Sequence, residues 1–137
     1  IGGASHGGLA ACFTALRYPD SFGGALCMSS SFWVGMAPSG PEERLEDSRL
    51  LRMLRRGLSR PVKPRLWVDW GLRRDGGFHN AVIEANAAAR SREFVELLRR
   101  RHGFDRSNLR DFEDRQGGHS ESCWRRRLPD ALRFMTD

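Results

Sequence analysis

The feature that most constrains this 137-residue chain lies at its start, where Gly3-Ala4-Ser5-His6-Gly7 is followed by a further glycine. A G-x-S-x-G segment typically turns sharply from a strand into a helix and lifts the serine hydroxyl above the edge of a sheet. Glycines flank the serine because the two backbone segments approach too closely for a Cβ atom. Residues 9–17 are helix-forming and end before Pro19. We therefore predict a strand–turn–helix unit with Ser5 at the turn.

A second glycine-rich loop, Gly117-Gly118-His119, favours a catalytic interpretation of that turn. It follows a short predicted strand at 109–114 and precedes a predicted helix over 122–135. Imidazole titrates close to working pH, which suits a general base. In α/β-hydrolases the histidine follows the serine in the chain and lies on a late loop. Taken singly, Ser5 also fits an incidental serine in a glycine turn, and His119 a solvated loop residue.

Strand and helix signals alternate along the rest of the chain. This alternation predicts an α/β architecture in which helices flank a mostly parallel sheet. We expect a partial α/β-hydrolase fold that lacks its N-terminal strands and forms a single truncated domain over residues 1–137. The length is sufficient for a buried core. The chain begins within the motif and without Met, so we expect it to be part of a longer polypeptide.

Several sequence blocks together make the chain similar to a known family. They are GASHGG at 3–8, RYPDSFG at 17–23, ALCMSSSFW at 25–33, LWVDWG at 66–71, and GGH at 117–119 with Trp124, Arg125 and Leu128. On these blocks the chain resembles the esterases related to esterase D, which include enterochelin, feruloyl and acetylxylan esterases, S-formylglutathione hydrolases and mycolyltransferases. The closing H-x-x-x-x-W-R arrangement is the most specific block. The resemblance frames nearly the whole chain except residues 35–60, and it implies Ser5 as nucleophile and His119 as base.

The third member of a catalytic triad is where the sequence departs from the family pattern. Family members usually carry an acid three residues after the glycine that ends the strand at 66–71, where this chain has Arg74. Asp75, one residue later, is the first candidate, because a loop can absorb such a shift; a solvated loop acid is an equal alternative. Glu84, on the helix that follows, is the second candidate. Three other acids are less suited by position: Asp69 lies within the predicted strand, and Asp114 and Glu121 would have to reach back from a neighbouring loop. A Ser–His pair without an acid also stays open.

The oxyanion hole is only half visible in the sequence. In this fold one donor is the backbone N–H of the residue after the nucleophile, here His6, helped by the positive end of the following helix. The second donor comes from a loop after an early strand. We expect that loop to precede Ile1.

Residues 35–60 form a separate segment between two predicted strands. We predict a helix over 42–57, with Pro41 at its first position and Gly57 at its end. An apolar face is provided by Leu45, Leu50, Leu51 and Leu54. Such a helical insertion either forms a partial lid over the site or packs on the flank of the sheet, and the second is favoured.

Charge and composition narrow the classes of ligand. The net charge is +6, with arginine triplets at 99–101 and 125–127, but no zinc-finger, RNA-binding or P-loop signature accompanies them. We expect the triplets on solvated outer faces of amphipathic helices, and no nucleic-acid partner. No apolar run is long enough to span a membrane. Cys12, Cys27 and Cys123 show no metal-ligand spacing, so we expect neither metal nor cofactor, and Cys12 and Cys27 as core thiols.

The sequence thus predicts a serine esterase that cleaves a small-molecule carboxylic ester through an acyl-enzyme on Ser5, with His119 as base. Two alternatives stay open: an acyltransferase of the same fold, and an inactive fragment or degenerate relative. Substrate and oligomeric state do not follow from the sequence. No signal peptide is visible, which slightly favours the cytoplasm, although the expected missing N-terminus leaves the compartment open.

Overall fold

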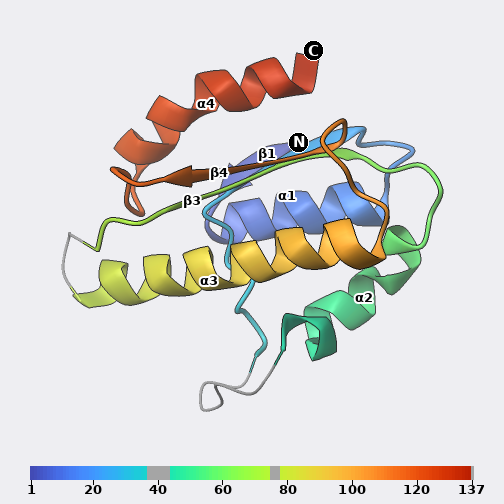
Figure 1. Cartoon of the computed structure of the whole chain (residues 1–137), viewed down its shortest axis with the longest axis horizontal. Helices are drawn as coiled ribbons and strands as arrows, with labels where there is room; N and C mark the ends of the chain where they lie inside the picture. The colour runs from blue at the N-terminus through green and yellow to red at the C-terminus, as the bar shows by residue number, and fades with distance from the viewer. Residues whose placement is uncertain (37–43, 75–77, 137) are drawn as a thin grey trace.

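The computed structural model describes residues 1–36, 44–74 and 78–136 (Figure 1). Its strands are β1 (Gly2–Ala4), β2 (Gly24–Met28), β3 (Arg65–Gly71) and β4 (Leu109–Asp114). Its α-helices are α1 (His6–Arg17), α2 (Arg49–Leu58), α3 (Phe78–Arg101) and α4 (Glu121–Thr136), and a 3₁₀ turn, η1, covers Leu45–Asp47. The predicted alternation of helices and strands is confirmed.

The four strands form one parallel sheet in the order β1-β2-β3-β4. Because every connection is a parallel crossover, the carboxyl ends of all four strands lie at the same edge. Strands β2 and β3 are buried almost throughout, which is why they read as short continuous apolar runs rather than as alternating patterns. The predicted α/β class with a parallel sheet is therefore confirmed, and it brings the segments after β1 and β4 to one edge.

Helices cover both faces of the sheet, so the molecule has three layers. Helices α1 and α3 lie on one face and α4 lies on the other (Figure 1). The main core between the sheet, α1 and α3 contains Cys12 and Cys27, as predicted for core thiols. A smaller cluster fills the space under α4 around Trp67 and Ala131.

The segment at 35–60 differs in part from the predicted helix. Helix α2 begins at Arg49, where the Ser48 hydroxyl accepts a hydrogen bond from the Leu51 N–H at 3.2 Å. The helix ends at Leu58, so Gly57 lies inside it rather than at its end. This glycine allows close packing against α1, since a Cβ there would lie 1.8 Å from the Leu16 carbonyl oxygen. The predicted helix start at residues 41–43 lies outside the described residues. Helix α2 packs against α1, and the lid role stays a prediction.

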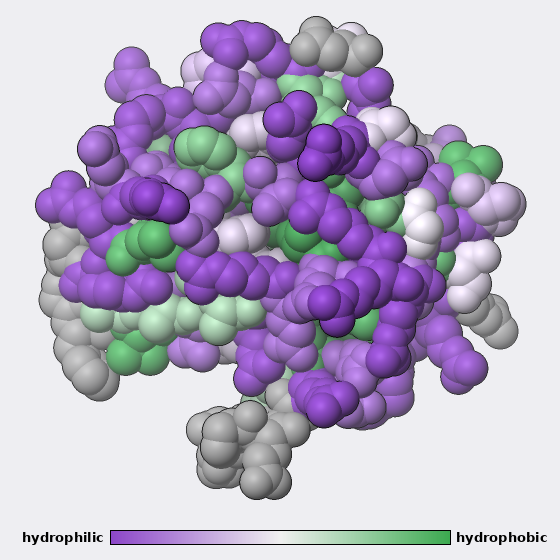
Figure 2. Space-filling view, in the orientation of Figure 1, coloured by the Kyte–Doolittle hydropathy of each residue, from purple (hydrophilic) through white to green (hydrophobic). Residues whose placement is uncertain are grey.

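Most of the charge lies on the outside. The face seen in Figure 2 is largely hydrophilic, with small apolar areas separated by polar side chains. In the triplet at the end of α3, each arginine has an acidic partner: Arg99 pairs with Asp111, Arg100 with Glu96 and Arg101 with Glu46. Both arginine triplets were expected on solvated helix faces. In the second triplet that expectation is wrong for Arg127, which is buried.

Candidate active site

Ser5 lies at the turn between β1 and α1 in a strained backbone conformation, with φ 56° and ψ −122°. A side chain other than glycine rarely adopts such a positive φ, and strain of this kind is concentrated at functional sites. The turn is held by the Ser5 N–H, which donates to the Met28 carbonyl at 2.9 Å. Two glycines allow the close approach: a Cβ at Gly3 would lie 2.5 Å from the Gly7 carbonyl carbon, and one at Gly8 would lie 2.9 Å from the Met28 oxygen.

The hydroxyl of Ser5 has a polar neighbour from the loop after β2. Its Oγ lies 3.3 Å from the Oγ of Ser31, which is itself 3.4 Å from the Nδ1 of His6. Ser31 is fully buried. The three side chains therefore form a short chain of weak hydrogen bonds at the amino end of α1.

His119 is paired with Glu84 rather than left in solvent. Its Nδ1 lies 2.8 Å from Glu84 Oε2, and the side-chain exposures are 8% and 0%. The other carboxylate oxygen, Oε1, accepts the N–H of Gly71 at the end of β3. A buried carboxylate bonded to one imidazole nitrogen fixes the tautomer and directs the other nitrogen outward.

Tight backbone packing assembles the loop around this pair. A Cβ at Gly71 would lie 2.2 Å from the Gly117 carbonyl oxygen, and one at Gly117 would lie 2.1 Å from Asp114 Oδ2. The ring of Trp124, from the first turn of α4, and the His119 imidazole form a T-shaped contact with 5.1 Å between ring centroids. The H-x-x-x-x-W block thus places its two aromatic rings in contact.

A buried charge network lies under the same loop. Arg127 pairs with Asp69 at 2.5 Å and with Asp114 at 3.3 Å. Burial raises the pKa of the Asp69 carboxyl, while the charge of Arg127 and the indole N–H of Trp67 oppose that rise. Ser29, the other non-glycine residue with positive φ among the described residues (40°), donates its N–H to Asp69.

The predicted residues are only partly brought together. Ser5 and His119 both follow strands at the carboxyl edge, but within the described part of the chain no hydrogen bond joins their side chains. Catalytic hydrogen bonds are often long in the absence of substrate. Asp75, the first acid candidate, lies outside the described residues; Glu84, the second, is the carboxylate that contacts His119. Asp69 lies within β3, as expected.

Sequence reasoning missed Ser31 and Arg127. No spacing rule links them to Ser5 or His119, because each contact depends on how the strands stack. The run of three serines after β2 was the available signal for Ser31. For Arg127, an arginine three residues after the tryptophan, the sequence suggested only a solvated helix face.

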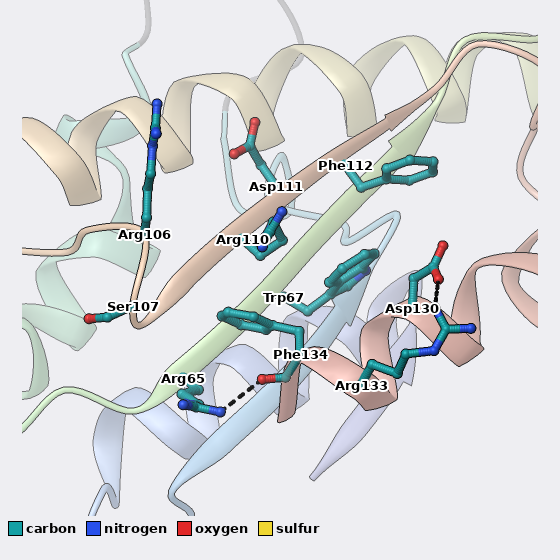
Figure 3. Close-up of a pocket in the computed structure, with 10 residues that line it drawn as sticks. All are labelled: Arg65, Trp67, Arg106, Ser107, Arg110, Asp111, Phe112, Asp130, Arg133 and Phe134. Carbon is teal, nitrogen blue, oxygen red and sulfur yellow. Dashed lines mark hydrogen bonds and ion pairs between the residues drawn. The ribbon is translucent and has the colours of Figure 1, made fainter. Parts of the chain in front are cut away.

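A separate groove lies on the α4 side of the sheet, away from these residues (Figure 3). Its volume is about 510 Å³, and its walls include Arg65 and Arg110 from the first residues of β3 and β4, with Phe134 of α4. Glu84 and His119 lie at the opposite, carboxyl end of those strands. The groove and the His119 site are therefore two different places on the molecule.

Neither a metal-binding cluster nor a membrane-spanning helix is found in residues 1–36, 44–74 and 78–136. In that part of the chain, no three His, Cys, Asp or Glu side chains are grouped to hold a metal ion. Within the same ranges, no helix combines the length and apolar character needed to cross a bilayer.

Comparison with known proteins adds the family. Residues 1–135 match the model of the Esterase family, described as "Putative esterase". The chain belongs to this esterase family. It is also 26% identical over 145 residues to the iron(III) enterobactin esterase of Dickeya dadantii (strain 3937), covering 98% of this chain and 28% of that relative. The chain therefore spans less than a third of the relative's length. No solved structure matches the chain significantly. The resemblance inferred from the sequence blocks is confirmed at the level of the family.

Proposed function

We propose that this esterase-family chain cleaves a carboxylic ester by two-step acyl transfer, with Ser5 as nucleophile, His119 as general base and Glu84 as the acid that orients it. The observation that carries the proposal is the 2.8 Å contact between His119 Nδ1 and the buried Glu84 carboxylate. With Nδ1–H donated to Glu84, Nε2 is the basic nitrogen, as a general base requires.

In the first step His119 Nε2 takes the Ser5 hydroxyl proton as Oγ attacks the ester carbonyl. The tetrahedral intermediate collapses when the leaving alkoxide receives that proton from His119. Water, deprotonated by the same nitrogen, then attacks the acyl-enzyme, and Ser5 recovers its proton as the acid is released. The developing oxyanion would accept the N–H of His6, which lies in the first turn of α1, where N–H groups have no partner within their own helix.

The arrangement of Ser5 supports its assignment as nucleophile independently of His119. Ser5 has a strained backbone conformation, and it lies directly after a parallel strand and directly before a helix. This is the strand–turn–helix context expected for a G-x-S-x-G serine. The Ser5 Oγ also lies 3.3 Å from the buried Ser31 hydroxyl, which gives it a polar neighbour at the turn.

Covalent labelling with a fluorophosphonate probe tests the proposal. We expect Ser5 to be labelled, identified by peptide mass spectrometry, and labelling to be lost in Ser5→Ala and strongly slowed in His119→Ala. Hydrolysis of p-nitrophenyl esters, and of iron(III) enterobactin as the substrate named for the relative, measures turnover. A folded protein that does not label at Ser5 would overturn the proposal. Product analysis with added alcohols separates hydrolysis from acyl transfer.

A further inference from the structure

We propose that Arg127 is a positioning residue for this reaction: its buried guanidinium holds the glycine loop that carries His119 over the strand ends, within reach of Ser5. The inference rests on the proposed function and extends it to a residue on α4. The inference is supported by the order of the strands and by four groups that contact the guanidinium.

Strand order creates a distance that the His119 loop must cover. Ser5 follows β1 and His119 follows β4, and β2 and β3 lie between them. Neighbouring strands are about 4.8 Å apart, so the ends of β1 and β4 are separated by roughly 14 Å. The loop after β4 must therefore reach back across the sheet. Gly117 and Gly118 permit such a path, but glycines do not themselves select it.

The Arg127 guanidinium contacts groups at three of these four strands, β2, β3 and β4. Its Nη1 donates to Asp69 Oδ1 of β3 at 2.5 Å and to the hydroxyl of Ser29, directly after β2, at 3.3 Å. Its Nη2 donates to the Gly118 carbonyl at 2.9 Å. Its Nε lies 3.3 Å from Asp114 at the end of β4. One rigid planar group thus joins the ends of three strands to the peptide next to His119.

Two further hydrogen bonds of the loop backbone complement the contacts of Arg127. The Gly118 N–H donates to Cys123 Sγ at 3.2 Å, and the Gly117 carbonyl accepts the Arg73 N–H at 2.9 Å. Because Arg127 is only 2% exposed, water cannot readily replace its bond to Gly118. The direction of the Gly118 peptide, and with it the position of His119, therefore depends on the guanidinium.

Charge balance determines which variant tests this role. Removal of the guanidinium leaves Asp69 buried without a cation, so we expect Arg127→Met to destabilise the fold for reasons unrelated to catalysis. Arg127→Lys keeps a positive charge beside Asp69, but one ammonium on a flexible stem cannot reproduce the fork that also reaches Gly118. The neighbouring Arg126 provides a matched control: it pairs with the same Asp114 oxygen at 2.8 Å, is exposed, and makes no bond to Gly118 among its described contacts.

The experiment compares Arg127→Lys with Arg126→Lys in the expressed protein. We measure thermal unfolding, kcat and KM on a p-nitrophenyl ester, the pH dependence of kcat/KM, and the NMR signal of the His119 Nδ1 proton. For Arg127→Lys we expect cooperative unfolding, a KM within about twofold, a kcat lowered about 10²-fold, and a shifted His119 signal and pH profile. For Arg126→Lys we expect all four readouts to match the unsubstituted protein.

Each outcome bears on the proposal. An Arg127→Lys protein that loses thermal stability but keeps its kcat, pH profile and His119 signal would make Arg127 a structural residue and overturn the inference. If Arg127→Lys does not fold, the neutral double variant Asp69→Asn/Arg127→Gln takes its place, with the same kcat loss expected. Absence of fluorophosphonate labelling in the unsubstituted protein refutes the proposed function instead. The NMR comparison then still decides whether Arg127 positions His119.

Discussion

The two halves of the candidate site are built in different ways. The Ser5 turn depends on a short local motif, since the glycines that permit it lie within three residues of the serine, and it packs on Met28 at the end of the neighbouring strand. The loop of His119 is held by partners far away in the chain. Glu84 is 35 residues from His119, and the residues that Arg127 ties to the loop include Asp69 and Ser29, 58 and 98 residues from the arginine.

This difference explains why the Ser5 motif and His119 are recognisable in the sequence, whereas the partners that hold His119 are not. A steric requirement for glycine produces a short motif of fixed spacing. A carboxylate that orients an imidazole needs only to arrive at the right place in space, so its sequence position is free. Substitutions in the two halves should therefore fail in different ways: crowding in the Ser5 turn, and loss of alignment in the His119 loop.

The largest effect on kcat is expected in the His119 half of the site, where Glu84 contacts the imidazole. Glu84→Gln keeps an oxygen for the Gly71 N–H but removes the charge that orients and stabilises the imidazolium. We expect kcat to fall by about 10³–10⁴-fold with little change in thermal stability, as measured by steady-state kinetics and calorimetry. Glu96→Gln, at an exposed position of the same helix paired with Arg100, is the control. A nearly unchanged kcat would return the role of the acid to another residue, with Asp75 next to be tested.

The local half is tested by two adjacent glycines. A Cβ at Gly8 would lie 2.5 Å from Ser30 Oγ and 2.9 Å from the backbone oxygen of Met28, whereas a Cβ at Gly7 would meet nothing within 4 Å. We expect Gly8→Ala to lower the free energy of unfolding by about 1–3 kcal/mol, measured by urea denaturation. Gly7→Ala, within α1, should raise it by roughly 0.5–1 kcal/mol. Equal effects of the two substitutions would contradict the close packing of this turn.

A smaller effect on kcat is expected from Ser31, which is distant in sequence but contacts Ser5. Ser31→Ala removes the hydroxyl that lies 3.3 Å from Ser5 Oγ and 3.4 Å from His6 Nδ1. Because the net value of such a bond is about 1 kcal/mol, we expect kcat to fall about fivefold. Ser30→Ala is the matched control, since the buried Ser30 hydroxyl has no partner among the described residues. Equal activities of the two variants would show that Ser31 does not act on the nucleophile.

The smallest effect separates folding from catalysis. Burial, followed by the charges of Lys63 and Arg101, lowers the pKa of His102 from its usual 6.5. The unfolded chain therefore binds more protons than the folded one, and stability is lost as pH falls from about 6.5 through the folded pKa. His102→Gln should flatten the dependence of the unfolding free energy on pH in this window. His102 follows α3 at the end opposite Glu84, so the pH profile of kcat/KM should stay unchanged; a shifted profile would link His102 to the site.

The fold was largely predictable because it depends on patterns of short range. The helix after Ser5 and the strand at 66–71 follow from apolar runs and glycine or proline boundaries, and the strand-like block at 25–33 contains β2, which ends at Met28. The start of α2 was placed too early, since the acids before Leu45 resembled a first turn while the true cap is Ser48. The burial of Arg127 was also missed: in the sequence it is one of three consecutive arginines, and only the partners beneath α4 distinguish it.

By itself, the sequence indicated the esterase family and a mostly parallel α/β sheet, and it singled out Ser5 and His119, on which the proposed chemistry depends. These follow from steric demands and periodicities that operate within a few residues. Only the tertiary structure decided that Glu84 contacts the imidazole and that Arg127, rather than its neighbour Arg126, is buried under the His119 loop. The physical reason is that a buried charge needs a partner in space, and the stacking of strands and helices, not spacing along the chain, determines which partner it meets.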